Sequence, residues 1–379
     1  MGEKINFGYL TASFVLAILM AGVVSAQQTP APLRPLPAVP IPQGNPQTPQ
    51  KVELGKLLFF DPRLSGDGSI SCASCHDPVT GWGDGKVLSQ GYPGTQHYRN
   101  AQTILNSAYM KELFWYGGVA DLETTVRVHL TSAFLMHADG QLLEERLRQV
   151  PEYSRRFQKT FGTLPMYGQI VNAISSYLRT LVSRDAPLDR YLRGDKESLT
   201  PLAIKGIELF QGKAQCYLCH NGPLLSDEKY YNVGVPENPE IRSNPLRHIS
   251  LRFDSLMLGA PGYHKTTQDL GRYMITKNNN DKGLFRTPTL REVARTAPYM
   301  HNGIFSTLDE IIDFYDRGGG GNSFGTKSPL LKPLGLTKEE KAALRAFLES
   351  LSGAEAKAET ATAPPDYQTL PLGKWDISK

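Results

Sequence analysis

Two short cysteine motifs of the same form constrain this chain more than any other feature. They read CASCH at residues 72–76 and CYLCH at residues 216–220, and they contain all four cysteines of the 379-residue sequence. An even number of cysteines in an exported protein would ordinarily predict disulfides. The histidine that directly follows each second cysteine points to a different chemistry.

The spacing within each motif matches what a covalently attached c-type haem requires. Two residues between the cysteines set the separation of the two thioether bonds, and the following histidine reaches the iron. A thioredoxin-like redox pair needs no such histidine and belongs beside a βαβ pattern, whereas a four-thiolate zinc site would leave both histidines unexplained. We therefore predict two haems, held by Cys72, Cys75 and His76 and by Cys216, Cys219 and His220.

The N-terminus predicts export from the cytoplasm. Lys4 precedes an apolar run at residues 14–24, and Val24-Ser25-Ala26 has the small residues of a signal-peptide cleavage site. The run is shorter than the roughly 20 apolar residues that span a bilayer. We therefore expect residues 1–26 to be a cleaved signal peptide, with a periplasmic mature protein and no stable membrane insertion. Residues 27–50, rich in proline and glutamine, predict an extended linker.

Helical periodicity dominates the rest of the chain and divides it into two comparable halves. An amphipathic helix precedes each cysteine motif, and the second of these helices begins with Thr200 as N-cap and Pro201. Sustained strand alternation is hard to find, so the predicted fold class is all-α with long loops. We expect domains at 51–195 and 196–352 and a disordered tail at 353–379. The net charge of only +4, without long basic runs, argues against a nucleic-acid-binding protein.

Three further segments carry a family resemblance. In chain order they read ELGKLLFFDPRLSGDGSISCASCHDP, FWYGGVADLE and FRTPTLREVARTAPYMHNGIFSTLDEIIDFY. They resemble the bacterial di-haem cytochrome c peroxidase superfamily, which includes the methylamine-utilisation enzyme MauG, over about residues 51–352. The resemblance implies two cytochrome c-like domains, each with one haem c. The N-terminal haem would react with hydrogen peroxide, and the C-terminal haem would transfer electrons.

The same resemblance assigns roles to residues that would otherwise pass as ordinary core or loop positions. Trp115 matches a tryptophan that lies between the two haems. Arg286 matches an arginine near the haems, where its fork of donors suits a propionate carboxylate. Asn100 and the carbonyls of Thr296 and Pro298 match an interdomain calcium site, and oxygen ligands suit that hard cation.

Tyr315 is the most informative position that the resemblance marks. In peroxidases that use cytochrome c, a methionine ligand lies 14 residues after the histidine that corresponds to His301, and this count gives Tyr315. MauG is similar to this chain in having a tyrosine ligand there. A phenolate stabilises ferric and higher-valent iron, whereas a thioether favours ferrous iron. The alternative is that Tyr315 is a buried aromatic residue and another side chain binds the iron.

The chain also departs from the family pattern. Leu135 stands where the family has its peroxidatic glutamate, and FWYGG replaces FWDGR. His129 and His137 are candidate substitutes for the glutamate, because imidazole both accepts and returns a proton near neutral pH; the alternative is that they are surface or propionate-facing histidines. Tyr92 stands where the family has a loop histidine that closes the peroxide face, and His97 is the nearby alternative.

Three functions remain as hypotheses. The first is a periplasmic, MauG-like oxidoreductase that uses hydrogen peroxide to oxidise a protein or another electron donor. The second is a cytochrome c peroxidase that reduces hydrogen peroxide with electrons from a small cytochrome. The third, which Leu135 suggests, is a non-enzymatic di-haem electron carrier. A redox partner protein is expected in each case, and the chain would be a monomer or a homodimer.

Overall fold

Helices joined by long loops make up nearly all of the regular structure. The computed structural model describes residues 1, 29–92, 94–321, 324–353 and 365–366. Within these ranges there are twelve α-helices and four strands of two residues each, which confirms a mostly helical fold. The expected signal peptide, apart from its first residue, and most of the expected tail lie outside the described residues. Among the helices of the described residues, none has both the length and the apolar composition of a membrane span.

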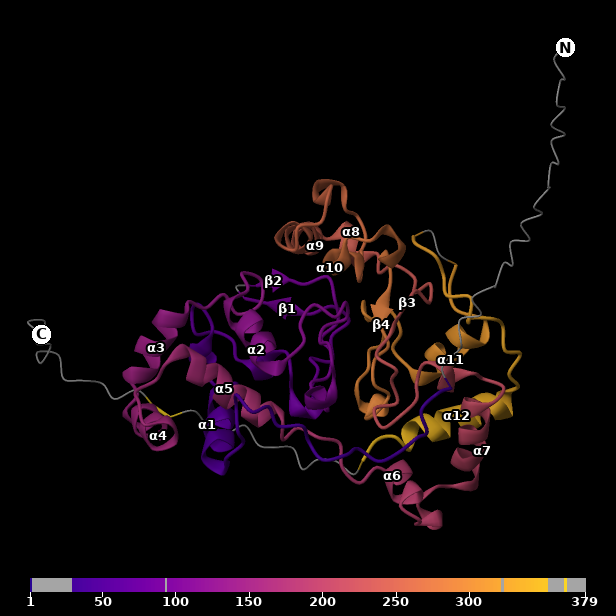
Figure 1. Cartoon of the computed structure of the whole chain (residues 1–379), viewed down its shortest axis with the longest axis horizontal. Helices are drawn as coiled ribbons and strands as arrows, with labels where there is room; N and C mark the ends of the chain where they lie inside the picture. Colours follow the sequence, from indigo (N-terminus) through magenta and orange to yellow (C-terminus); the bar gives the residue numbers. More distant parts are fainter. Residues whose placement is uncertain (2–28, 93, 322–323, 354–364, 367–379) are drawn as a thin grey trace, which may run out of the picture.

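The first half of the chain forms a helical unit at one side of the molecule (Figure 1). Its helices are α1 (Pro49–Phe59), α2 (Leu122–Thr131), α3 (Gly140–Arg148), α4 (Pro151–Phe161) and α5 (Tyr167–Leu178). Helix α1 begins at Pro49 because the side chain of Thr48 accepts a hydrogen bond from the Lys51 amide at 3.3 Å. The apolar faces of these helices enclose one continuous core.

The second half forms a similar unit at the other side (Figure 1). Its helices are α6 (Pro187–Leu192), α7 (Pro201–Gln211), α11 (Leu308–Asp316) and α12 (Lys338–Glu349). The Thr200 side chain caps α7, as the sequence predicts, by accepting a hydrogen bond from the Ala203 amide at 3.1 Å. Phe210 and Phe347 pack edge to face at 4.8 Å in the core of this unit.

A glycine sets the closest helix crossing in both units. A Cβ atom on Gly55 of α1 would lie 1.9 Å from the Ala173 carbonyl oxygen of α5. A Cβ atom on Gly206 of α7 would lie 2.1 Å from the Ala343 carbonyl oxygen of α12. The helix that leads into each cysteine motif is therefore held by the same kind of close backbone contact.

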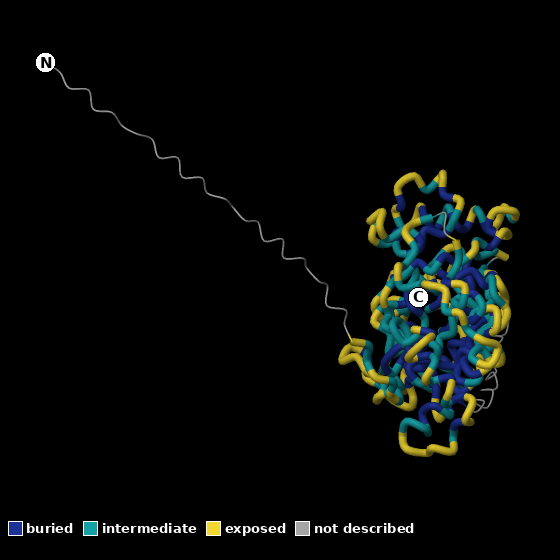
Figure 2. The backbone as a smooth tube through the Cα atoms, turned by 90° about the vertical axis from the view of Figure 1, so that its right-hand side faces the viewer, coloured by how far each residue is buried: buried dark blue, intermediate teal, exposed yellow. Residues whose placement is uncertain are grey.

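A third group of elements, of which only α9 is longer than four residues, covers the junction of the two units. It comprises α8 (Glu240–Ser243), α9 (Pro245–Met257), α10 (Tyr273–Thr276), and the hairpins β1 (Gln90–Gly91) with β2 (Thr95–Gln96) and β3 (Tyr230–Tyr231) with β4 (Phe285–Arg286). The sequence predicts only long loops here. Helix α9 nevertheless has an ordinary start, because Asn244 caps the Leu246 amide at 3.0 Å and Pro245 follows. Figure 2 shows buried residues inside the units and exposed residues mainly on the outer loops.

The N-terminal strap, residues 29–48, has no helix or strand and runs along both units (Figure 1). At one end the Gly222 amide donates to the Ala31 carbonyl at 3.0 Å. At the other end the Asn45 side chain donates to the Asn172 carbonyl at 2.9 Å. The segment expected as an extended linker is thus hydrogen-bonded to the body of the protein.

Candidate functional site

Both cysteine motifs open into one cavity of about 900 Å³ between the two units. The lining includes Cys72, Cys75 and His76 of the first motif and Cys216, Cys219 and His220 of the second. The four cysteines are free thiols, so the alternative of disulfides within the chain has no support. The cavity therefore brings together the two groups of residues that the spacing assigned to haem.

The first motif presents one imidazole nitrogen to this cavity. His76 Nδ1 lies 3.1 Å from the Trp82 carbonyl oxygen, so Nδ1 donates its proton there and Nε2 keeps its lone pair. Burial lowers the pKa of His76 to about 4, and nearby His129 contributes in the same direction. The neutral imidazole that results is the form that binds iron.

The second motif repeats this arrangement. His220 Nδ1 lies 3.0 Å from the Leu225 carbonyl oxygen, and burial lowers the pKa of His220. In each motif the carbonyl fixes the tautomer and the ring orientation, as is usual for metal-binding histidines. Two thiols and an oriented imidazole at each position fit the attachment of a c-type haem.

Tyr315 lies in the cavity near the second motif. It belongs to the last turn of α11, a helix that begins with a reciprocal capping box between Thr307 and Glu310. Burial raises the pKa of Tyr315, and the nearby sulfurs of Cys216 and Cys219 add to this effect. The tyrosine that the resemblance marked as an iron ligand therefore shares one part of the cavity with the second haem motif.

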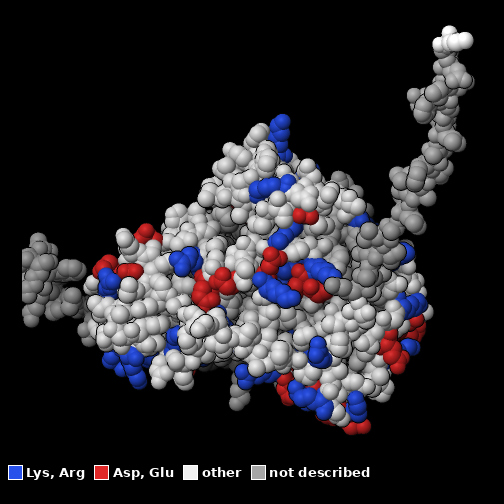
Figure 3. Space-filling model, viewed as in Figure 1, with Lys and Arg blue, Asp and Glu red and all other residues white. Residues whose placement is uncertain are grey.

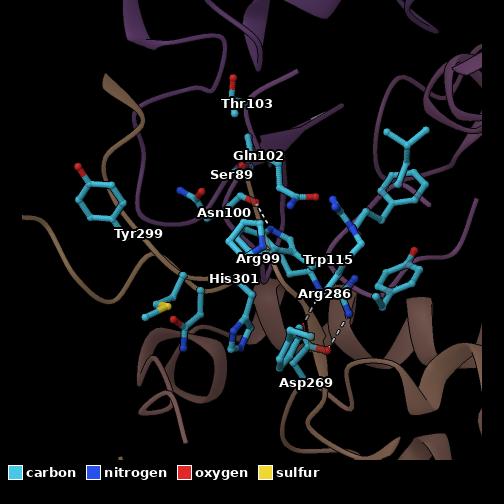
Figure 4. Close-up of a pocket in the computed structure, with 18 of the residues that line it drawn as sticks. Ser89, Arg99, Asn100, Gln102, Thr103, Trp115, Asp269, Arg286, Tyr299 and His301 are labelled. Atoms are coloured by element: carbon cyan, nitrogen blue, oxygen red, sulfur yellow. Dashed lines mark hydrogen bonds and ion pairs between the residues drawn. The ribbon is translucent and has the colours of Figure 1, made fainter. Parts of the chain in front are cut away.

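Trp115 and Asn100 come from the first half and meet residues of the second half (Figure 4). The Trp115 indole nitrogen donates to the Asn100 carbonyl at 3.0 Å, and the Asn100 amide donates to the His301 carbonyl at 2.8 Å. The Trp115 ring packs edge-on to His301 with centroids 6.4 Å apart, and His301 stacks on Phe285 at 3.7 Å. These contacts put Trp115 at the junction of the two units.

Arg286 is a buried cation with donors left for a ligand. Its amide donates to the Trp115 carbonyl at 2.9 Å, and its Nε lies 3.4 Å from the Phe114 carbonyl oxygen. Among the described residues, no hydrogen-bond partner lies within reach of its buried Nη1. Burial lowers the pKa of Arg286. A guanidinium of this kind, lining the cavity, fits the carboxylate of a haem propionate.

The three positions predicted for calcium also line the cavity. They are Asn100, Thr296 and Pro298. The Asn100 side-chain amide donates to the Lys86 carbonyl at 2.7 Å, which orients its carboxamide. An amide oxygen and two backbone carbonyls are oxygen donors of the kind that calcium prefers. The chemistry of these donors therefore fits a hard cation.

The histidines proposed to replace the glutamate lie in different places. His129 lines the cavity, 6.2 Å from the His76 ring and stacked on Phe114 at 5.3 Å. His137 is exposed, packs against Tyr92, and is outside the cavity lining, as Tyr92 is too. Leu135, which stands where the family has its glutamate, also lines the cavity.

His97 also lines the cavity, between the rings of Tyr98 and Phe134. Its Nδ1 accepts a hydrogen bond from the Arg99 amide at 3.2 Å. Burial lowers the pKa of His97 to about 3, and the Arg99 charge contributes in the same direction. The neutral ring therefore carries its proton on Nε2.

Sequence reasoning missed the ion pair that joins the loop after β2 to the elements over the junction. Arg99 binds Asp269 through two hydrogen bonds, of 2.5 Å from Nε and 2.7 Å from Nη2, and both side chains are buried (Figure 4). The Tyr98 hydroxyl donates to Asp254 of α9 in the same place. More than 150 residues separate the partners in each pair, and no local pattern in the sequence marks them.

Comparisons with known proteins agree with this geometry. A family model described as di-haem cytochrome c peroxidase matches residues 49–197. The cytochrome-c peroxidase IdrP1 of Pseudomonas sp. (strain SCT) is 48% identical over 375 residues, covering 97% of this chain and 98% of the relative. The methylamine utilization protein MauG of Methylorubrum extorquens is 34% identical, covering 84% of this chain and 83% of the relative.

A solved structure of a MauG-like protein associated with microbial copper homeostasis aligns with a TM-score of 0.71 at 32% identity. The alignment covers 84% of this chain and 93% of that one. Overall identity is higher to the relative named cytochrome-c peroxidase than to the relative named MauG. The chain therefore belongs to the di-haem cytochrome c peroxidase family, and it is a peroxidase with two haem groups.

Proposed function

We propose that this protein is a periplasmic peroxidase that reduces hydrogen peroxide with electrons taken one at a time from a small redox protein. One observation carries this proposal: both haem motifs open into one cavity, with Trp115 between the two units. The name of the relative that is 48% identical, a cytochrome-c peroxidase, supports the same reaction. The export pattern at the N-terminus and the need of c-type haem for attachment outside the cytoplasm support the location.

The residues that would hold the two haems divide into two sets. His76 would bind the iron of the peroxide-reactive haem, and His220 with Tyr315 would bind the iron of the electron-transfer haem. Haem bound at these positions supplies iron that reacts with peroxide and exchanges electrons. Arg286 would hold a propionate through its free Nη1, and Asn100, Thr296 and Pro298 would bind a calcium ion that ties the two units together.

Two imidazoles of opposite tautomers support proton transfer without the family's glutamate. His97 accepts a backbone hydrogen bond at Nδ1 and therefore offers a proton at Nε2. His129 Nδ1 lies 2.8 Å from the Thr125 carbonyl oxygen and donates to it, so its Nε2 is a proton acceptor. Cleavage of peroxide needs both a base for one oxygen and an acid for the other. We assign the base to His129 and the acid to His97.

The test is turnover by the holoprotein with a reduced small c-type cytochrome. We expect oxidation of the cytochrome to require both the protein and hydrogen peroxide, and peroxide to change the Soret band of the protein. A protein whose Soret band is indifferent to peroxide in every redox state would contradict the proposal and leave only an electron carrier.

Tyr315 supports a second candidate, the MauG-like oxidation of a protein substrate. A phenolate ligand would make the second haem a poor acceptor for electrons from a high-potential cytochrome and better suited to hold oxidising equivalents. Tyr92 lies outside the cavity lining, so it is not in position to close the peroxide site. A resting ferric protein that reacts with peroxide at once would favour this candidate, whereas a need for half-reduction would favour the first.

A further inference from the structure

Two adjacent tyrosines on β3 connect the cavity to the outside of the molecule. Tyr231 lines the cavity and interacts with the Cys219 thiol of the second motif. Tyr230, its neighbour on the strand, is outside the cavity lining and pairs with Arg286 in the β3–β4 hairpin. Tyr231 therefore faces the cavity beside the second motif, and Tyr230 lies outside the lining, against Glu112 and Arg272.

The hydroxyl of each of these tyrosines donates a hydrogen bond to a carboxylate. The Tyr231 hydroxyl donates to Asp227 at 2.8 Å, and the Tyr230 hydroxyl donates to Glu112. The Glu112 side chain is 36% exposed, so the outer end of this pair reaches solvent. A carboxylate can take up a proton, which a backbone carbonyl cannot do at neutral pH.

Other tyrosines of the described part lack this combination of carboxylate and location. Tyr109 and Tyr217 donate to backbone carbonyls, of Pro37 at 2.9 Å and of Ala31 at 2.6 Å. Tyr98 and Tyr153 donate to carboxylates, but both are fully buried. None of these four tyrosines combines a carboxylate partner with a place between the cavity and solvent, as the β3 pair does.

The surroundings of Tyr230 hold its hydroxyl at one position. The Arg272 guanidinium lies 4.2 Å from the Tyr230 ring centre and donates to the hydroxyl at 3.0 Å. Arg272 also binds Glu112 at 3.2 Å, so the phenol and its acceptor share one cation. Gly117, at a φ of +66°, makes room, because a Cβ there would lie 1.6 Å from the Tyr230 hydroxyl oxygen. Any larger residue at 117 would displace the phenol.

We propose that Tyr231 and Tyr230 carry oxidising equivalents from the second haem site to the surface beside Glu112, where an external one-electron donor is oxidised. Each equivalent moves as one electron from Tyr230 through Tyr231 to the oxidised site, while the Tyr230 phenolic proton moves to Glu112. The external donor, a reduced redox protein, then returns one electron to Tyr230, and Glu112 returns the proton. Two such cycles, with two protons from solvent, reduce one hydrogen peroxide to two water molecules.

This inference rests on the proposed peroxidase function, and the experiment separates the two. The holoprotein is mixed with hydrogen peroxide without donor, frozen, and examined by electron paramagnetic resonance. A parallel sample with a nitroso spin trap is digested and its adduct located by mass spectrometry. We expect a tyrosyl signal and an adduct on Tyr230, both lost in Tyr230→Phe and both kept in the matched control Tyr109→Phe.

Glu112→Gln isolates the role of the carboxylate as the proton acceptor of Tyr230. Glutamine keeps a hydrogen-bond acceptor but cannot take up the proton, so the tyrosyl signal should fall and donor oxidation should slow by roughly 10²-fold. The change of the Soret band on adding peroxide should stay unchanged in this variant and in Tyr230→Phe. An adduct on another residue, or full donor oxidation by Tyr230→Phe, would overturn the route. A wild-type Soret band that ignores peroxide would overturn the peroxidase function and the route with it.

Discussion

The first and second cysteine motifs have the same local structure. Each follows a helix held by a glycine crossing, and each histidine is oriented by a backbone carbonyl, of Trp82 or Leu225. The surroundings across the cavity differ. Imidazoles and the apolar Leu135 accompany the first motif, whereas Tyr315 of α11 accompanies the second. The motif decides where haem is attached, and distant segments decide what each haem does.

The charged surface adds little to this contrast. On the face drawn in Figure 3, basic and acidic side chains are mixed over both units. The residues that differ between the two sites line the cavity, so substitutions there can separate the roles of the sites.

The largest expected effect is a loss of stability when the glycine at either helix crossing is replaced. This loss should be equal in the two halves. We expect Gly55→Ala and Gly206→Ala each to lower the free energy of unfolding by about 1–3 kcal/mol, because the new Cβ meets a backbone oxygen that cannot turn away. Alanine favours helices by about 1 kcal/mol over glycine, so the loss occurs against that preference. Urea unfolding measures it.

Gly168→Ala in α5 is the control for both variants. A Cβ at Gly168 meets nothing within 4 Å, so this substitution should leave stability unchanged or raise it. If Gly55→Ala and Gly206→Ala behave like Gly168→Ala, the two halves are not built on the same contact.

His97→Gln tests the proton transfer that we assign to the first site. Glutamine keeps a polar side chain but cannot shuttle a proton, so the rate of reaction with hydrogen peroxide should fall by roughly 10²-fold. Stopped-flow absorbance of the Soret band follows this rate. His137→Gln, at an exposed position outside the cavity lining, is the matched control and should react as the wild type does. If His137→Gln reacted slowly with peroxide and His97→Gln reacted at the normal rate, the proton donor would be His137 and not His97.

Tyr315→Met tests whether Tyr315 is the iron ligand that we propose for the second site. A thioether in place of a phenolate should raise the reduction potential of one haem by on the order of 0.1 V and leave the other unchanged. A spectroscopic redox titration resolves the two haems. Two unchanged potentials would show that Tyr315 is not a ligand, and the second haem would then have another partner in the cavity.

The sequence predicted the mostly helical fold and the two haem motifs that line the cavity, because short motifs with strict spacing carry those features. It also proposed His137, which lies outside the lining. The Thr200 cap of α7 follows from local hydrogen-bonding rules alone. Helix α9 also had a local signal, the Asn244-Pro245 start, which the surrounding glycine, asparagine and proline residues obscured. Contacts such as Arg99 with Asp269 could not be predicted, because they depend on how distant segments fold together.

The last expected effect, which is absent at neutral pH, is a pH dependence of stability that comes from the first site. Burial depresses the pKa of His97 from 6.5 to about 3 in the folded protein, next to Arg99, while Asp269 opposes this shift. Below about pH 6.5 the unfolded chain binds a proton at His97, whereas the folded protein does not. The contribution of His97 to the free energy of unfolding is therefore complete above that pH and declines as the pH falls toward 3. The free energy of unfolding of His97→Gln should therefore depend less on pH in this window than that of the wild type, with His137→Gln as control. Identical slopes for His97→Gln and the wild type would mean that His97 is not held neutral in the fold, and its role as the proton donor of the first site would fail with it.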